Sequence, residues 1–315
     1  RWRLRGWGCC GVRWCLRGGE GRINELRMPS IGTDSAKLRC SSSATTNDGL
    51  LSAVVSRTAR HVAATAHRDR RAIAQVFTPA SVAQFMAARV SRIDEAFTFI
   101  DAGAGVGVLA PPVCERTAAM PKPRRVVAEL YETDANVLPV LRQTVAECRK
   151  ALAASGHNLD ARIIEEDFVL RRPSASLYAP APRTGYADVV IMNPPYAKLA
   201  KDSPQARAFA EIVHGQPNVY ALFMAAAVEL LRPGGELIAI TPRSYCNGLY
   251  FREFRRWLLA RMSLRHVHLF ESRRATFKDS EVLQESIIPV ATKQTEQAAE
   301  VSLSVSHGAE MDEAK

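Results

Sequence analysis

Residues 99–107 read Phe-Ile-Asp-Ala-Gly-Ala-Gly-Val-Gly, an apolar stretch that ends in an acid and continues into three alternating glycines. Glycine lets the backbone pass close to a ligand, and a helix that follows presents free N–H groups to it. The Gly-x-Gly-x-Gly spacing differs from the Gly-x-Gly-x-x-Gly of dinucleotide-binding folds, which disfavours a nicotinamide oxidoreductase. Taken alone, these residues fit a ligand-binding loop or a tight turn without a ligand.

Strand-like and helical patterns alternate around this stretch. The predicted strands cover residues 97–101, 125–132, 161–166, 187–192, 236–241, 264–270 and 286–292. The clearest helical patterns cover residues 134–154, 218–231 and 250–260. Alternation of this kind predicts an α/β fold with a doubly wound, mostly parallel sheet. No long helix separates the last two strands, so we expect one of them to be antiparallel.

The segment before this sheet has two parts. Residues 1–27 are rich in Arg, Gly, Trp and Cys without any period, and the first Met is Met28, so we interpret residues 1–49 as a disordered or non-native segment and a linker. N-terminal helices are predicted to precede the sheet, one over residues 50–74 and another opened by Thr78 as N-cap and Pro79 in its first turn.

Composition excludes several classes of protein. The 315 residues carry a formal net charge of +10, and no apolar run approaches the roughly 18 residues of a membrane span, so we expect no membrane partner. Seven cysteines without a Cys-x-x-Cys pair argue against a disulfide scaffold, a zinc ribbon or a thioredoxin-type site, and favour a reducing cytoplasm. The basic excess suggests a polyanionic partner, with nucleic acid first.

Acids follow the second and third predicted strands. Glu132 can accept hydrogen bonds from the two hydroxyls of a ribose, and Asp134 is predicted to be the N-cap of the next helix. Asp167 can accept from a purine amino group, while Phe168 can pack on the purine face. Ordinary strand-end turns facing water remain the alternative for each.

The fourth strand ends in Asn193-Pro194-Pro195-Tyr196. Prolines fix the backbone and remove two N–H donors, so a rigid loop offers two acceptors, the Asn193 side-chain oxygen and the Pro194 carbonyl. Tyr196 adds a flat face on which a ring can stack. Such a loop suits a planar substrate that carries an NH2 group, because two acceptors can hold both hydrogens.

Together, and in this order, these motifs resemble the S-adenosylmethionine-dependent amino-methyltransferases. More narrowly, the chain resembles the adenine-specific DNA methyltransferases of restriction-modification systems, with the cofactor-helix motif first. The resemblance covers roughly residues 70–292. Further stretches that carry it are residues 75–79, 220–223, 231–235, 240–245 and 277–285.

The resemblance implies a Rossmann-like sheet of seven strands, the last antiparallel, with S-adenosylmethionine as cofactor. It implies that the cofactor is bound by Phe77, Thr78, Pro79, Asp101, Gly103, Gly105, Gly107, Glu132, Asp167 and Phe168. It also implies that Asn193 and Pro194, with Pro195 stiffening the loop, hold the amine of a flipped adenine while Tyr196 stacks on it. A second aromatic clamp is expected late in the chain, and Phe277 is the candidate.

Double-stranded DNA is the expected partner. Residues 243–274 contain eight Arg and two Glu, and Arg243, Arg252, Arg255 and Arg256 are candidates for phosphate contacts. A solvated helix face is the alternative. His266 and His268 share a strand face, but without a carboxylate or Cys at ligand spacing no metal is predicted.

Residues 50–292 are expected to form the catalytic domain, and residues 293–315 a tail or the start of a missing target-recognition domain, which a partner could also supply. The predicted function is site-specific methylation of adenine in DNA. The alternatives are methylation of a protein glutamine, methylation of an RNA base, and an inactive nucleic-acid-binding fragment. The glutamine methyltransferases usually follow the Asn-Pro-Pro-Tyr motif with a Glu-Pro segment, which is not found after Tyr196.

Overall fold

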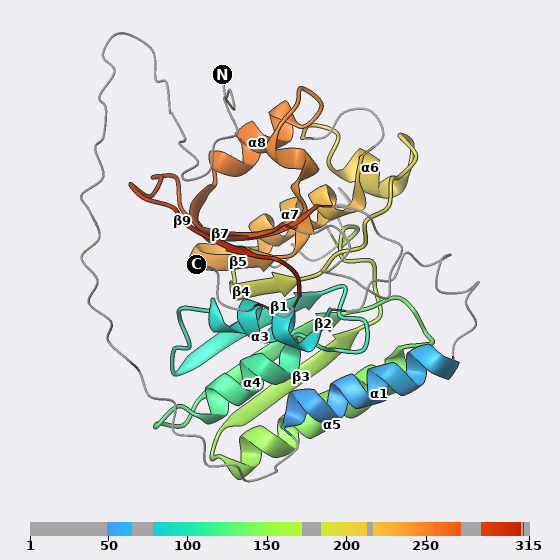
Figure 1. The fold of residues 1–315 in the computed structure, drawn as a ribbon, viewed down its shortest axis with the longest axis vertical. Coiled ribbons are helices and arrows are strands. Elements are labelled where there is room, and N and C mark those ends of the chain that lie inside the picture. Colours follow the sequence, from blue (N-terminus) through green and yellow to red (C-terminus); the bar gives the residue numbers. More distant parts are fainter. Residues whose placement is uncertain are drawn as a thin grey trace, which may run out of the picture. The chain divides into compact units, whose positions relative to one another are not determined.

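The computed structural model describes residues 49–64, 78–171, 184–212, 217–271, 285–309 and 311 (Figure 1). Its strands are β1 (Ala96–Ala102), β2 (Arg125–Tyr131), β3 (Asn158–Ile164), β4 (Ala187–Met192), β5 (Leu231–Ala239), β6 (Thr241–Pro242), β7 (Met262–Phe270), β8 (Ser286–Lys293) and β9 (Ser302–Ser306). Its helices are α1 (Leu50–Ala64), α3 (Ala80–Ala88), α4 (Ala110–Ala118), α5 (Leu138–Ala154), α6 (Pro204–Ala208), α7 (Val219–Leu230) and α8 (Arg252–Leu259), with a 3-10 turn η1 (Arg243–Cys246).

One sheet in the order β3-β2-β1-β4-β5-β8-β7-β9 organises the described chain. Strands β1 to β5 pair in parallel, and β8 runs antiparallel to both β5 and β7. All seven predicted strands are present, and the last of them, β8, is antiparallel as expected. The strand order reverses at β1 and β4, so the carboxyl ends of these strands open a crevice in which ligands of α/β sheets lie.

Helices cover both faces of the sheet because the central strands are apolar on both sides. Phe99 and Ile191 belong to a core cluster that also contains buried residues of α1, α3, α4 and α5. Their chain neighbours Ile100 and Val190 point the other way, into a second cluster with residues of α7 and α8. Successive strand residues face opposite sides of a sheet, so near-continuous apolar strands need two layers of helices (Figure 1).

The sheet has two strands that the sequence did not predict. The short β6 pairs antiparallel with β8, and β9 pairs in parallel with β7 at the edge of the sheet. The sheet therefore extends past residue 292, into a stretch that composition alone marks as polar and acidic.

Two predicted helix caps are wrong. Pro79, not Thr78, occupies the cap position of α3, and no side chain caps this helix. The Thr78 hydroxyl instead accepts a hydrogen bond from the side chain of Asn193. Likewise α5 begins at Leu138 after Val137, whereas the Asp134 carboxylate accepts hydrogen bonds from Asn136 in the turn before it.

No helix among the described residues is both long enough and apolar enough to cross a lipid bilayer.

Candidate active site

A cavity opens at the carboxyl ends of β1 to β4, between the loops that follow these strands and the start of α7. Nine of the positions predicted from the sequence line it. They are Thr78, Gly103, Gly105, Glu132, Asp167, Phe168, Asn193, Pro194 and Pro195. The structure thus brings together residues from five separate segments, while Pro79, Asp101, Gly107 and Tyr196 lie outside the cavity wall. Phe77 and Phe277 lie outside the described residues.

The glycine loop after β1 uses all three glycines in the left-handed region, with φ of +75° at Gly103, +56° at Gly105 and +83° at Gly107. A Cβ added at Gly105 would meet no atom within 4 Å, so this position borders open space in the cavity. At Gly107 it would lie 2.8 Å from a methyl carbon of Leu141, so here glycine lets the loop pack against α5. Gly105 therefore leaves room for a ligand, and Gly107 leaves room for a helix.

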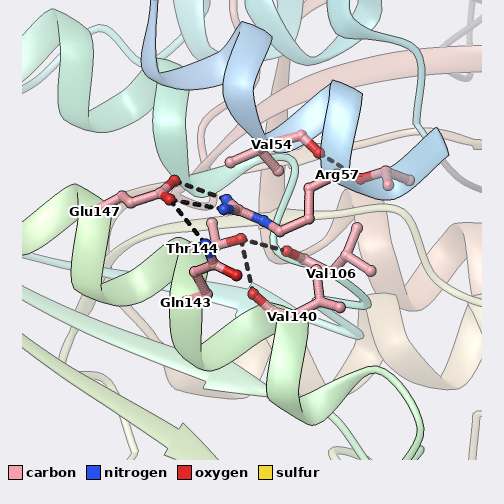
Figure 2. Close-up of polar contacts among 8 residues, drawn as sticks. Val54, Arg57, Val106, Val140, Gln143, Thr144 and Glu147 are labelled. Atoms are coloured by element: carbon pink, nitrogen blue, oxygen red, sulfur yellow. Dashed lines mark hydrogen bonds and ion pairs between the residues drawn. The ribbon is translucent and has the colours of Figure 1, made fainter. Parts of the chain in front are cut away.

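Helix α5 holds this loop from behind (Figure 2). The Thr144 hydroxyl donates to the Val106 carbonyl at 2.9 Å. One turn further along α5, Glu147 forms a two-pronged ion pair with Arg57 of α1 at 2.6 and 2.7 Å. This contact raises the pKa of Arg57 and lowers the pKa of Glu147, the hydrogen bond being the main cause in each case. Helix α1 thereby fixes the helix that supports the loop.

Asp101 lies behind the loop and is completely buried. Neither carboxylate oxygen has a hydrogen-bond partner among the described residues. Burial, with a smaller contribution from the charge of Glu132, raises the pKa of Asp101 to about 8. Asp101 is therefore a neutral carboxylic acid at neutral pH, and the loop has an unpaired polar group beneath it.

We expect Asp101→Asn to change how stability depends on pH. In the unfolded chain the carboxyl loses its proton above its ordinary value of 3.8, whereas the folded protein keeps the proton up to about pH 8. The wild-type free energy of unfolding should therefore fall between these two values as pH rises, and that of the asparagine variant should fall less. Urea unfolding between pH 4.5 and 8.5 measures this, and parallel curves for the two proteins would contradict it.

Glu132 faces the loop from the end of β2. One carboxylate oxygen accepts the N–H of Gly105 at 2.7 Å, and the other accepts the N–H groups of Thr133 and Asp134 at 2.8 Å each. An acceptor that three backbone donors hold in place is well fixed for hydroxyl groups of a ligand in the cavity.

An aromatic wall closes the cavity beside the end of β3. Phe168 packs edge-on against Tyr131, with ring centroids 5.1 Å apart, and lies 5.3 Å from Phe223 of α7. Asp167 does not project freely, because it accepts from the N–H groups of Val169 and Leu170 and from the Gln205 amide. Phe168 is thus almost completely buried beside these rings, and Asp167 holds the turn that carries it.

The loop after β4 places the Asn193 side chain in the same cavity as the glycine loop. Its amide nitrogen donates to the Thr78 hydroxyl at 3.0 Å, and its side-chain oxygen accepts from the Tyr196 hydroxyl at 3.1 Å. Both ends of the carboxamide are thus held by side chains from different parts of the chain. This fixes the direction of the carbonyl.

Tyr196 is anchored away from the cavity wall. Its hydroxyl also lies 3.1 Å from the Ile240 carbonyl, and its ring packs edge-on against Tyr220 with centroids 6.5 Å apart. Burial raises the pKa of Tyr196 well above its ordinary value, so the phenol stays protonated and able to donate. In this structure the residue therefore positions Asn193.

The four predicted DNA-contact arginines separate into two groups. Arg243 pairs with Glu285, and Arg255 donates to the carbonyls of Tyr245, Asn247 and Gly248 at 2.7–2.9 Å, so both have structural partners. Arg252 and Arg256 share Glu253 on the surface of α8, with side chains 64% and 74% exposed. The Arg243 side chain is also 54% exposed, but it is paired with Glu285, whereas Arg252 and Arg256 have no partner outside α8 among the ion pairs of the described residues.

His266 and His268 lie on one face of β7, as their spacing predicts. Their ring nitrogens hydrogen-bond to Ser302, Ser304 and Ser306 of β9 at 2.8–3.0 Å. Among the described residues, no group of three or more His, Cys, Asp or Glu has an arrangement that could hold a metal ion.

Sequence reasoning missed several residues of the cavity. Gln205 of α6, Leu199 and the α7 residues Val219 and Phe223 line it, but they follow no strand end. Phe223 lies within the stretch 220–223 that carries the resemblance, which was the one signal for it.

The fold, together with a glycine loop, strand-end acids and an aromatic wall around one cavity, is that of the S-adenosylmethionine-dependent methyltransferases. A solved structure of a protein assigned to class I of these enzymes, from Listeria monocytogenes, superposes with a TM-score of 0.58 at 14% identity. The match covers 82% of this chain and 74% of that one. At this identity the likeness supports the fold alone, and it confirms the predicted fold class.

Sequence relatives indicate a narrower class of methyltransferases. Residues 153–277 match the Eco57I restriction-modification methylase family. The chain is 35% identical to the Type II methyltransferase M.BsuBI of Bacillus subtilis over 247 residues, which is 76% of this chain and 47% of that protein. It is 33% identical to the Type II methyltransferase M.PstI of Providencia stuartii, with 71% and 44% covered.

The chain spans a little under half the length of these curated relatives. The predicted resemblance to methyltransferases of restriction-modification systems is confirmed at this level. S-adenosylmethionine is the cofactor that the fold and the matching methylase family indicate.

Proposed function

We propose that this chain carries the catalytic region of a DNA methyltransferase, which transfers a methyl group from S-adenosylmethionine to the exocyclic amine of an adenine flipped out of the duplex. The similarity to Type II methyltransferases supports DNA as the substrate. Within the chain, residues 50–292 are assigned to catalysis.

One observation carries this proposal. Asn193, whose carboxamide is fixed at both ends, and Pro194 line the same cavity as Gly105, Glu132 and Phe168. A loop of hydrogen-bond acceptors and a loop suited to a cofactor therefore face one space. That juxtaposition is what transfer from a bound donor to an amine requires.

The cofactor assignment follows from the shape and chemistry of the wall. Gly105 borders open space, Glu132 offers a fixed carboxylate for ribose hydroxyls, and the buried Phe168 is the residue we assign to the side of the adenine ring. Asp101 lies beneath the loop as an acid that can give up its proton when a cation approaches. When bound there, S-adenosylmethionine supplies an electrophilic methyl group on a sulfonium.

Catalysis by the chain itself rests on Asn193 and Pro194. The amino nitrogen of adenine is a poor nucleophile, because its lone pair is delocalised into the ring. Acceptors on both of its hydrogens favour tetrahedral geometry and localise the lone pair on nitrogen. The two dipoles would stabilise the positive charge that develops on the nitrogen as its bond to the methyl carbon forms and the carbon–sulfur bond breaks, after which the nitrogen would lose a proton to solvent.

The amine of a paired adenine is buried in the duplex, so the base must rotate out before it can reach this cavity. Unstacking costs a few kcal/mol, and contact with an aromatic face can return about 1–3 kcal/mol. We assign this contact to Tyr196, which reaches it by turning from its present packing. The same residue releases the Asn193 oxygen as the base arrives.

Methyl transfer to three acceptors tests the proposal. The chain is incubated with tritiated S-adenosylmethionine and unmethylated plasmid, bulk tRNA or a glutamine-bearing protein. Label should appear in plasmid alone, as N6-methyladenine after digestion to nucleosides. Label in tRNA or protein would favour an RNA or glutamine methyltransferase instead, and plasmid binding without label would favour an inactive nucleic-acid-binding module.

Thr78 is expected to act as a positioning residue through its hydrogen bond to Asn193. In Thr78→Val the Asn193 amide loses this acceptor, so kcat should fall about 5- to 20-fold, as the loss of one hydrogen bond predicts. Thr78→Ser keeps the hydroxyl and should restore most of the rate. Steady-state kinetics on plasmid DNA would contradict this role if both variants changed only the KM for S-adenosylmethionine.

A further inference from the structure

The loop between η1 and α8 carries two apolar side chains into solvent. Leu249 is 83% exposed, the most exposed large apolar residue in the part of the chain that the structure describes, and its neighbour Tyr250 is 51% exposed. Single exposed leucines are common on protein surfaces and need no explanation by themselves. We call Leu249 and Tyr250 together the loop tip.

Arg255 of α8 holds the backbone next to the loop tip. Arg255 donates three hydrogen bonds to carbonyls of the loop, at Tyr245, Asn247 and Gly248. Gly248 turns the chain with φ of +73°, immediately before Leu249. An arginine with three backbone acceptors fixes the loop in one conformation, so the exposure of Leu249 is built into the fold.

An aromatic chain joins the loop tip to the loop after β4. Tyr250 packs edge-on against Phe251 at 4.8 Å, and Phe251 lies 6.1 Å from Tyr220. Tyr220 contacts Tyr196 and also hydrogen-bonds through its hydroxyl to Ser244 at 2.9 Å. The loop tip is therefore supported by the same residue that supports Tyr196, at the end of the sheet where the cavity opens.

A net positive charge follows the loop tip along the chain. Arg252 and Arg256 follow it on α8, and their side chains are the exposed pair that shares Glu253. Two arginines and one glutamate leave a net positive charge at this edge. Apolar side chains next to exposed arginines fit a partner that presents stacked rings bordered by phosphates.

We infer that the loop tip is a wedge that inserts between base pairs of duplex DNA beside the flipped adenine, with Leu249 as the inserted side chain. This inference rests on the proposed function and extends it by naming the surface that opens the stack. Apolar side chains that enter a base step partly unstack it and kink the duplex. Arg252 and Arg256 then lie where they can hold the adjacent phosphates.

Methyl transfer by matched variants is the first measurement. The asparagine side chain of Leu249→Asn is of similar size, but its polar amide must give up hydrogen bonds to water to enter the base stack. We expect the kcat/KM of this variant on unmethylated plasmid to fall by about tenfold, the loss expected for one stacked contact. The control is Leu303→Asn, which changes an exposed leucine of β9, 46% exposed, away from the cavity. Its rate should stay within about twofold of wild type.

Fluorescence gives a direct readout of insertion. The wild-type protein first methylates the plasmid to completion, and the incorporated label counts the acceptor sites. Leu249→Trp is then titrated with unmethylated plasmid at no more than one protein per site, with wild type and Leu303→Trp measured in parallel. Stacking on bases should quench the added tryptophan of Leu249→Trp and leave that of Leu303→Trp unchanged.

The two measurements separate failure of the wedge from failure of the proposed function. If wild type transfers no methyl group to plasmid, the proposed function itself fails at the first step. If wild type is active but Leu249→Asn is equally active, or Leu249→Trp co-sediments with plasmid without being quenched, the wedge is wrong. Equal loss in Leu249→Asn and Leu303→Asn would likewise overturn it, because the effect would not belong to the loop tip.

Discussion

Asn193→Ala is expected to lower methyl transfer to unmethylated plasmid by about 10²- to 10³-fold or more, the range seen when one fixed dipole is removed from a reacting centre. The alanine variant loses an acceptor for the target amine and cannot localise the lone pair on its nitrogen. Its backbone and the loop after β4 should persist, because Pro194 and Pro195 fix the chain there.

Cofactor binding separates this result from a general defect. Calorimetric affinity for S-adenosylhomocysteine should stay within a few-fold of wild type, because the residues assigned to the cofactor come from other loops. Asn193→Ala that lost cofactor binding and transfer together would place the residue in the cofactor site instead. Tyr196→Phe is a useful companion, since it keeps the aromatic face and should weaken capture of the base less than Tyr196→Ala does.

Gly107→Ala is expected to destabilise the fold by roughly 2–5 kcal/mol. A left-handed backbone at a residue with a side chain costs about 1–2 kcal/mol, and overpacking costs typically 1–3 kcal/mol more. Both conditions hold, since Gly107 has φ of +83° and the new methyl group would lie 2.8 Å from Leu141 and 3.1 Å from Thr144. Thr144 also holds the Val106 carbonyl, so the loop would shift with the helix.

Gly105→Ala is the matched control, because it lies two residues away in the same loop. Its φ of +56° imposes a backbone cost, but a methyl group there would meet nothing within 4 Å. The loss of stability should therefore be near the lower figure of about 1 kcal/mol, with a marked loss of affinity for S-adenosylhomocysteine. Urea unfolding and calorimetry on both variants measure this, and equal losses of stability would contradict the assignment of Gly107 to helix packing.

Strand ends made much of the site predictable. Gly105, Glu132, Phe168 and Asn193 follow four different strands, and the carboxyl ends of parallel strands meet at one edge of the sheet. Correct prediction of these strands was therefore enough to predict that the four residues converge around one cavity. By the alternation of strand residues, Asp101 lies on the same face of β1 as Phe97 and Phe99, which belong to the first core cluster, and this accounts for its burial.

Other features depend on contacts that no local pattern contains. Thr78 reads as a helix cap in sequence, yet its partner Asn193 is 115 residues away, and only the folded sheet brings them together. Strand β9 is different, because Ser302–Ser306 alternates between serine and apolar residues as an edge strand does. The acidic composition of the surrounding residues obscured this alternation. His266 and His268 of β7 form the hydrogen bonds that hold the serines of β9.

The bond between Tyr196 and Asn193 bears on which guests the cavity admits. The Asn193 amide oxygen has two lone pairs, so an incoming donor can bind it beside the Tyr196 hydroxyl or in place of it. A hydroxyl group has a single hydrogen, so it can satisfy only one of the two acceptors, the Asn193 oxygen or the Pro194 carbonyl. An amino group has two hydrogens and can satisfy both. The pair of acceptors would in this way make the pocket selective for amines over alcohols.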